Sequence, residues 1–297
     1  MKKIKLTIIT ALLEFDTNLI ETFDSIKELL FEKKLKWVIK YSKKQAPDEM
    51  LELFSGYENI SIIECYDNSV YEALNECVDL VDTEYFLVLG SGDKFADGAL
   101  LIIEKEIEKN KADGFIFSSE YPKFINYPKL DEIHYRMPGS HQGMVLNTKK
   151  VISLGKFNTC YKFTADYDLI CKYYLKYPNI ITSQDVISIF KGQGMSHYNK
   201  FECALELYLI AHKYWKSRYK NLEFNETIIQ NLTYTNEVVK KDIMEKNTDL
   251  QIQEINTKID ILMQALELAH QDFTNLYEEV QSMKISKQNM FQKKPTI

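Results

Sequence analysis

Apolar residues follow two different periods along the first 118 positions of the chain. Short β-branched runs, such as IKLTIIT at 4–10 and KWVIKY at 36–41, are typical of strands buried in a parallel sheet. Between such runs the apolar positions recur every three or four residues, which predicts amphipathic helices. The alternation predicts an α/β domain whose parallel strands are joined by right-handed crossovers. The expected strands are 4–10, 36–41, 60–66, 84–89 and 114–118, and the expected helices are 17–34, 48–54, 69–82 and 97–111.

The pattern changes after the fifth expected strand. Prolines, tyrosines and charged residues are interspersed over 119–140, which predicts a long surface loop. The segment 164–178 predicts a further helix, because its apolar residues share one face behind an N-terminal Thr-x-Asp. From about residue 201 the pattern is helical, with almost no strand signal.

A regular alternation of three- and four-residue spacings begins at residue 252 and continues for four and a half heptads. This seam is typical of a coiled coil rather than of a lone amphipathic helix. It is compatible with a coiled coil of two, three or four helices. The predicted organisation is a globular domain at 1–215, a helical connector at 216–247, an oligomerising coiled coil at 248–285 and a basic tail at 286–297. The seam residues are Ile252, Ile255, Ile259, Leu262, Leu266, Ala269, Phe273, Leu276, Val280 and Met283.

Charge and composition narrow the class of protein. The net charge of −6 argues against a protein that coats nucleic acid, which would present a basic face. Arg136 and Arg218 are the only arginines, so a phosphate site would depend on lysine, backbone amides or a metal. The five scattered cysteines lack metal-ligand spacing and are expected to be reduced. No apolar run reaches the roughly 18 residues of a membrane span, and we expect a cytoplasmic protein. The basic tail leaves open a weak attraction to an anionic membrane.

Three acidic segments are candidates for chemistry, and each also has a purely structural interpretation. Asp93 ends the Gly90-Ser91-Gly92-Asp93 turn after the strand at 84–89. It is therefore either a hard ligand for Mg²⁺ or Mn²⁺ beside a diphosphate or a simple turn residue. Asp166 and Asp168 begin a helix, where a carboxylate acts either as a cap or as a general base. Asp67 closes the strand at 60–66 and, alone, would be a helix cap. His141 and His197 are equally compatible with core, solvated or ligand roles.

Together these segments resemble a known family. The order DNSVYEALN, LGSGD, HQG and LGKFNTCYKFTADYDL is similar to that of family 2 glycosyltransferases with the GT-A fold, of the bacterial capsule, lipopolysaccharide or exopolysaccharide type. The resemblance covers about residues 4–200. It implies a Rossmann-like, mostly parallel GT-A catalytic domain, followed here by C-terminal helices and a coiled coil. The implied activity is inverting transfer of a sugar from a nucleotide-sugar donor, with UDP favoured, to a saccharide or lipid-linked saccharide acceptor.

The resemblance also implies roles for individual residues. Asp166 would be the catalytic base, and Asp93 would bind a divalent Mn or Mg ion together with His197. His141, Gln142 and Asp168 would lie on the acceptor side, and aromatic residues of the 119–140 loop would wall the acceptor. The implied donor-binding residues are Thr10, Ala11, Asp67, Tyr71, Asn75, Ser91, Gly92 and Asp93. The aromatic residues are Tyr121, Phe124, Tyr127 and Tyr135.

Two positions depart from the family pattern. The family often has an aspartate after the second strand, where this chain has Lys40-Tyr41-Ser42, so base recognition is expected to differ. Ser91 replaces the first acid of the DxD-like motif, so metal dependence is expected to be weak or conditional. These departures leave open a non-catalytic scaffold on a degenerate transferase fold. A nucleotidyltransferase is a third reading, although its basic N-terminal phosphate loop is not visible in the sequence.

Overall fold

The computed structural model describes residues 5–192, 194 and 199–215. The chain divides into two compact units, Met1–Asn199 and Lys200–Ile297, and the described part of the second is helix α8 (Lys200–Trp215). His197 and the predicted connector (216–247), coiled coil (248–285) and tail (286–297) lie outside the described residues. The predicted domain boundaries therefore remain predictions. Within the described residues, no helix is long and apolar enough to cross a membrane.

The N-terminal half forms the strand–helix alternation that the sequence predicts. Strands β3, β2, β1 and β4 lie side by side in that order, and every pair among them is parallel. Ile9 of β1 is opposite Val38 on one side and Val88 on the other, and all three are buried. The bounds are β1 (Leu6–Leu12), α1 (Thr17–Phe31), β2 (Lys36–Tyr41), α2 (Asp48–Phe54), β3 (Ile60–Glu64), α3 (Val70–Asp79) and β4 (Tyr85–Val88).

The second half of the sheet is mixed, so the prediction of a mostly parallel sheet is wrong beyond β4. Strand β8 lies between β4 and β6 and is antiparallel to both, whereas β9 is parallel to β6. β8 is reached through a long loop without a crossover helix, and this allows the antiparallel direction. The bounds are β5 (Lys94–Phe95), α4 (Ala99–Lys109), β6 (Gly114–Tyr121), β7 (Phe124–Asn126), β8 (Met144–Asn147), α5 (Thr148–Ser153), α6 (Ala165–Lys176) and β9 (Ile180–Ile189).

The predicted surface loop at 119–140 is partly wrong. β6 continues to Tyr121 and turns through Pro122 into the short strand β7, where Tyr121 is opposite Phe124. Those two rings stack with centroids 4.8 Å apart, and Phe190 packs against Tyr121 at the same distance. Cross-strand aromatic pairing therefore stabilises a hairpin where the prolines indicated a loop. Strands β5 and β9 are also absent from the sequence prediction.

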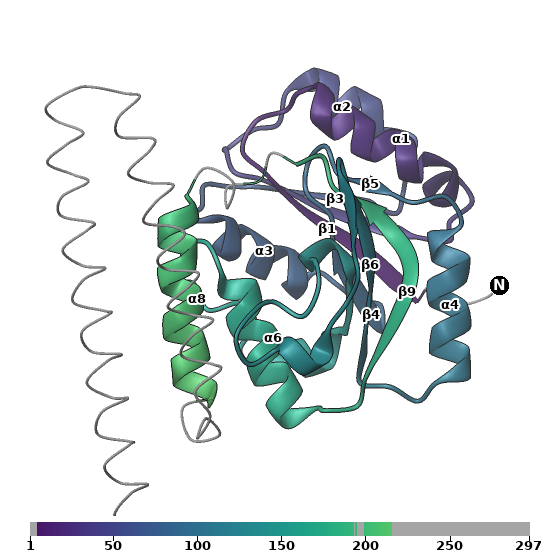
Figure 1. Cartoon of the computed structure of the whole chain (residues 1–297). Helices are drawn as coiled ribbons and strands as arrows, with labels where there is room; N and C mark the ends of the chain where they lie inside the picture. Colours follow the sequence, from purple (N-terminus) through teal and green to yellow (C-terminus); the bar gives the residue numbers. More distant parts are fainter. Residues whose placement is uncertain (1–4, 193, 195–198, 216–297) are drawn as a thin grey trace, which may run out of the picture. The chain divides into compact units, whose positions relative to one another are not determined.

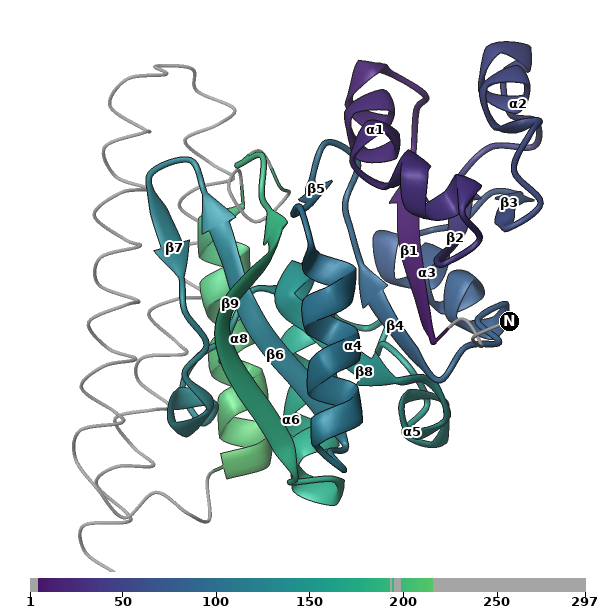
Figure 2. The same cartoon turned by 90° about the vertical axis from the view of Figure 1, so that its right-hand side faces the viewer.

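Helices cover both faces of the sheet. Figure 1 shows α1, α2 and α4 on one side and α3 and α6 on the other, and Figure 2 shows α4 lying along β9 and β6. The first face holds one apolar cluster that includes Phe23, Trp37, Met50 and Ile103. Of the apolar positions that predict α1 (Leu19, Ile20, Phe23, Ile26, Leu29 and Leu30), only Ile20 is exposed, at 37%. Because helices cover both faces of the sheet, the polar groups described below lie near the ends of the strands.

Candidate functional site

The turn Gly90–Asp93 lies at the carboxyl end of β4 and is organised by a buried carboxylate. Asp93 is only 4% exposed. Its Oδ2 accepts hydrogen bonds from Gly90 N at 3.2 Å and Gln142 Nε2 at 3.0 Å, and its Oδ1 accepts one from Lys191 N at 3.0 Å. Burial raises the pKa of Asp93, although these hydrogen bonds oppose the shift. The carboxylate thus joins three segments that are distant in sequence.

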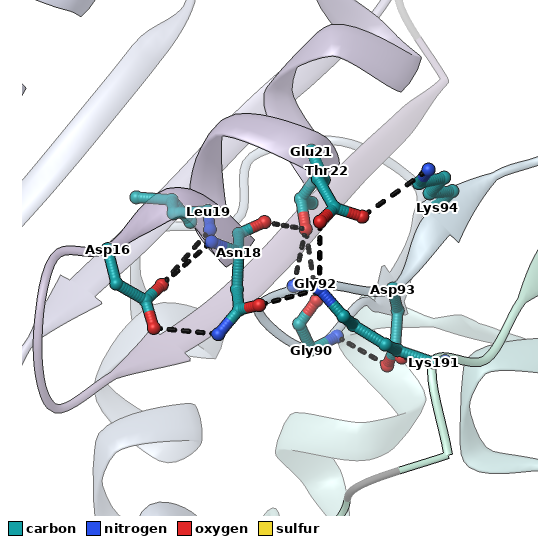
Figure 3. A network of polar contacts seen from close by, with 10 residues as sticks. All are labelled: Asp16, Asn18, Leu19, Glu21, Thr22, Gly90, Gly92, Asp93, Lys94 and Lys191. Carbon is teal, nitrogen blue, oxygen red and sulfur yellow. Dashed lines mark hydrogen bonds and ion pairs between the residues drawn. The ribbon is translucent and has the colours of Figure 1, made fainter.

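A polar network attaches this turn to helix α1 (Figure 3). Gly92 has a φ of +93°, a conformation suited to glycine, and its N–H donates to Thr22 Oγ1 at 2.9 Å. Lys191 lies across the turn, and its ammonium donates to Asn18 Oδ1 at 2.7 Å and to Glu21 Oε1 at 2.8 Å. The sequence analysis missed Lys191, and its place in the sequence Lys191-Gly192-Gln193-Gly194 was the available signal.

The turn offers hard oxygen donors to a cation. Ser91 Oγ is buried and has no hydrogen-bond partner within the described part of the chain, and Asp93 Oδ1 accepts a single hydrogen bond. Nowhere among the described residues do three or more His, Cys, Asp or Glu side chains form a metal cluster. Ser91 Oγ and Asp93 Oδ1 are oxygen atoms of the hard type that Mg²⁺ and Mn²⁺ bind.

A second acidic centre is Asp166, in the first turn of α6. Its Oδ1 accepts a hydrogen bond from Tyr167 N at 2.9 Å and lies 3.3 Å from the hydroxyl of Tyr71, which also donates to Phe163 O at 2.8 Å. Its Oδ2 lies 3.7 Å from His141 Nδ1. Asp166 retains 22% side-chain exposure, so its carboxylate is oriented and still accessible.

The 3₁₀ turn η2 (His141–Gly143) connects the two acidic centres. His141 lies against Asp166, while the next residue, Gln142, donates to Asp93. Ser140 Oγ in turn donates to Gln142 Oε1 at 2.5 Å and fixes the amide. Burial lowers the pKa of His141, and the charge of Asp166 only partly opposes this. The structure thus links Asp93 to Gln142 and Asp166 to His141 through one short turn.

Asp67, after the end of β3, forms a separate cluster with the buried side chain of Lys40. Lys40 Nζ contacts Asp67 Oδ2 at 3.2 Å and Glu76 Oε2 at 3.4 Å, and it donates to Cys65 O. Burial acts to lower the pKa of Lys40, but these hydrogen bonds and carboxylates outweigh it and raise the pKa overall. Lys40, in the Lys40-Tyr41-Ser42 segment that departs from the sequence pattern, is therefore a charged ammonium beside a candidate donor residue.

Other predicted site residues have structural partners. The Thr10 side chain is fully buried, donates to Leu89 O and accepts from Trp37 Nε1, so only its backbone lies at the strand end beside the half-buried Ala11. The Asn75 amide exchanges two 2.9 Å hydrogen bonds with the backbone of Phe157. Asp168 is 1% exposed, 3.6 Å from Lys172.

No protein-family model and no curated protein sequence matches the chain, but solved structures do. S. aureus TarS (residues 1–349) in complex with UDP-GlcNAc is 13% identical, with a TM-score of 0.63, over 95% of this chain and 92% of that one. Its complex with UDP gives 12% identity and the same TM-score. The mannosyltransferase PcManGT from Pyrobaculum calidifontis, in complex with GDP-Man and Mn²⁺, is 14% identical, with a TM-score of 0.59, over 98% of this chain and 88% of that one. These likenesses show a shared mixed α/β fold with a curled sheet.

Proposed function

We propose that this chain, whose fold is that of GT-A-type glycosyltransferases, is an inverting glycosyltransferase using a nucleotide-sugar donor. The observation that carries the proposal is η2, which holds Gln142 on Asp93 and His141 beside Asp166. The proposed phosphate-binding turn and the proposed carboxylate base thus contact the same short turn, and the first lies at the carboxyl end of β4. A sugar placed between them would have its leaving group on one side and its acceptor on the other.

The donor side extends from the end of β3 to the turn after β4. Asp67 would contact the base, and Tyr71 and Asn75 on the following helix would lie near the donor. Thr10 and Ala11, at the end of β1, would lie against the nucleoside. Ser91, Gly92 and Asp93 would lie at the diphosphate. UDP is the proposed nucleotide, supported by the UDP and UDP-GlcNAc complexes of TarS.

A divalent ion is proposed at Ser91 and Asp93, with His197 as a further ligand. Support comes from the Ser91 hydroxyl, which has no hydrogen-bond partner among the described residues, and from the Mn²⁺ in the mannosyltransferase complex. When bound, such an ion neutralises charge that develops on the departing diphosphate.

Asp166 is proposed as the general base. Tyr167 N donates to its Oδ1, and Oδ2 is the oxygen proposed to meet an acceptor hydroxyl. As that hydroxyl attacks the anomeric carbon, its proton passes to Asp166. The bond from the anomeric carbon to the diphosphate breaks, and its electron pair leaves with the diphosphate. Attack from the face opposite the leaving group inverts the anomeric centre.

The acceptor is proposed to be a saccharide or a lipid-linked saccharide in surface polysaccharide or glycolipid synthesis. His141, Gln142, Asp168 and the aromatic side chains of the 119–140 segment are its proposed surroundings. The exposed rings of Phe124 (58%) and Tyr127 (48%) are suited to stacking against sugars.

We further propose a cytoplasmic location with peripheral membrane contact, and a homo-oligomer formed through residues 248–285.

The test separates binding from turnover. The melting temperature is measured with UDP, GDP, CMP and dTDP, each in the presence of Mn²⁺, Mg²⁺ or EDTA. It should rise with one of these nucleotides, because a ligand that binds only the native state stabilises that state. Asp166→Asn should keep this shift and lose at least about a hundredfold in turnover of the corresponding nucleotide sugar. Asp131→Asn, which alters an exposed carboxylate of η1 (Leu130–Glu132), is the matched control. Undiminished turnover in Asp166→Asn would refute its role as base.

A non-catalytic scaffold is the second candidate. It is favoured by the occupation of Asp93, whose carboxylate already accepts hydrogen bonds from three N–H groups. No shift with any nucleotide would support this alternative over the transferase.

A further inference from the structure

Asn75 of α3 holds the backbone of a residue that lies 82 positions later in the chain. Its Nδ2 donates a hydrogen bond to Phe157 O at 2.9 Å, and Phe157 N donates one to its Oδ1, also at 2.9 Å. Phe157 lies in the segment that connects α5 to α6. Because an amide offers both a donor and an acceptor, one side chain fixes both backbone groups of Phe157.

The turn before Phe157 is strained and is held by contacts from two helices. Lys156 has a φ of +60°, a conformation that residues with a Cβ adopt at an energetic cost. Its ammonium contacts Asp79 of α3 at 2.6 Å, and its carbonyl oxygen accepts a hydrogen bond from Lys172 Nζ of α6 at 2.5 Å. Helices α3 and α6 lie on the same side of the sheet (Figure 1). Together they stabilise an unfavourable turn that leads directly into Phe157.

The ring of Phe157 packs against two side chains that lie beside Asp166. Phe157 is 2% exposed, and its ring centroid lies 5.7 Å from that of Tyr71 and 5.5 Å from that of His141. Both distances are typical of aromatic pairs. The hydroxyl of Tyr71 lies 3.3 Å from Asp166 Oδ1, and His141 Nδ1 lies 3.7 Å from Asp166 Oδ2. One ring therefore contacts the neighbours of both carboxylate oxygens.

We propose that Asn75 and Phe157 are positioning residues for the Asp166 carboxylate. The Asn75 amide places the Phe157 ring, and the ring keeps Tyr71 and His141 at the two oxygens. The inference deepens the proposed function and rests on it, because Asp166 is the proposed base. It gives Asn75, for which the resemblance implies donor binding, a role on the side where the acceptor hydroxyl is deprotonated. Both residues act through their neighbours rather than on the reacting atoms.

The Phe157 ring also limits the contact of His141 with water. Burial lowers the pKa of His141, and the charge of Asp166 acts in the opposite direction. Displacing the ring admits water to the imidazole, so the pKa of His141 should rise towards its ordinary value of 6.5. The imidazolium would then pair with Asp166 Oδ2 and occupy the oxygen that is proposed to meet the acceptor hydroxyl.

The first measurement follows His141 directly and needs no substrate. Asn75→Ala removes the two hydrogen bonds to Phe157, and Phe157→Leu removes the ring. Histidine side-chain NMR of the full chain, with the His141 signal identified by its loss in His141→Gln, gives the pH at which His141 titrates. We expect this midpoint to rise in both variants.

The second measurement separates the base from the donor site. In both variants kcat for the nucleotide sugar of the stabilising nucleotide should fall about tenfold to a hundredfold, because the base is less well aligned. The rise in melting temperature with that nucleotide, chosen from UDP, GDP, CMP and dTDP, should stay as in the wild type. A residue that binds the donor would instead lose this rise.

Matched controls lie in the β2–β3 part of the fold. The Asn59 amide donates to two backbone carbonyls at 2.9 and 2.5 Å, and Asn59→Ala removes both hydrogen bonds. Phe54 is 5% exposed and packs against the rings of Phe23 and Trp37, and Phe54→Leu removes those contacts. Both controls should lower stability and leave the His141 titration and kcat unchanged.

The outcomes distinguish the two levels of the proposal. An unchanged His141 titration together with an unchanged kcat in either variant overturns the positioning role and leaves the transferase proposal standing. The same holds if Asn75→Ala loses the nucleotide-induced rise while His141 titrates as in the wild type. If one variant does not fold, the other decides alone. A wild-type chain that none of the four nucleotides stabilises overturns the proposed function and the positioning role with it.

Discussion

Burial determines the protonation state of His141 and therefore how it contacts Asp166. The pKa of His141 is lowered below its ordinary value of 6.5, because the imidazolium form loses hydration. At neutral pH the ring is neutral, and its Nδ1 lies 3.7 Å from Asp166 Oδ2. In the proposed reaction a neutral neighbour leaves the carboxylate free to accept a proton from an acceptor hydroxyl, whereas an imidazolium would pair with it.

This burial predicts a pH dependence of stability. Below pH 6.5 the unfolded chain binds a proton at His141 that the folded chain resists, so the free energy of unfolding should fall as the pH falls. At pH 5.5 the loss from this residue is at most about 1.4 kcal/mol. Urea unfolding at pH 7.5 and 5.5 should show a smaller drop for His141→Gln than for the wild type. Equal drops would contradict the buried neutral state.

Among the structural elements, η2 depends on one close backbone approach. A Cβ at Gly143 would lie 2.4 Å from Phe117 O and 3.1 Å from Ser119 Oγ. Phe117 is in β6, which is hydrogen-bonded to strands on both sides, so η2 must move instead.

Gly143→Ala should therefore displace His141 and Gln142 together. We expect a loss of about 1–3 kcal/mol in unfolding free energy and a weaker nucleotide-induced rise in melting temperature. Gly56→Ala is the control, because a Cβ there meets nothing within 4 Å. Equal stability of the two variants would show that η2 tolerates the side chain.

The sequence predicted the elements whose periodicity is local. β2 and α2 form over the residues expected, because alternating strand and helix patterns each bury a face against a neighbour in the same βα unit. β9 was not predicted because half of its residues are polar, so its own pattern is not that of a buried strand. Its partners, β6 and β5, are about 65 or more residues away in the sequence. The hairpin at Tyr121 was not predicted because the prolines favoured a loop, and the aromatic pairing that stabilises it is not visible in the sequence pattern.

For the candidate site, sequence motifs located the carboxylates but not their partners. Asp93 and Asp166 stand in recognisable motifs, whereas Lys191 and Thr22 act on the turn through contacts between segments about 70 to 170 residues apart. Lys40 was visible only as a departure from a pattern. Its ion pair with Asp67 depends on the neighbouring ends of two strands and cannot be inferred from spacing.

At the scale of the whole molecule, the regular seam over 248–285 predicts self-association. Removing residues after 245 should reduce the number of chains per particle, obtained from the mass measured by light scattering, because the apolar stripe has no other partner in the predicted organisation. Leu262→Asp in the full chain should act in the same direction by placing a charge in the seam. An unchanged number of chains per particle in both cases would contradict oligomerisation through this segment.

The contacts around Asp93 also determine when the site exists during synthesis. Asp93 is tied to Gln142 and Lys191, which follow it by 49 and 98 residues, and Lys191 reaches back 173 residues to Asn18. Closing such loops is entropically costly, and these contacts therefore form late in folding. A nascent chain on the ribosome would expose a complete β1–β4 sheet with an unfinished turn until Lys191 has left the exit tunnel. The Asp93 turn is thus complete only in a molecule whose strand β9 is in place.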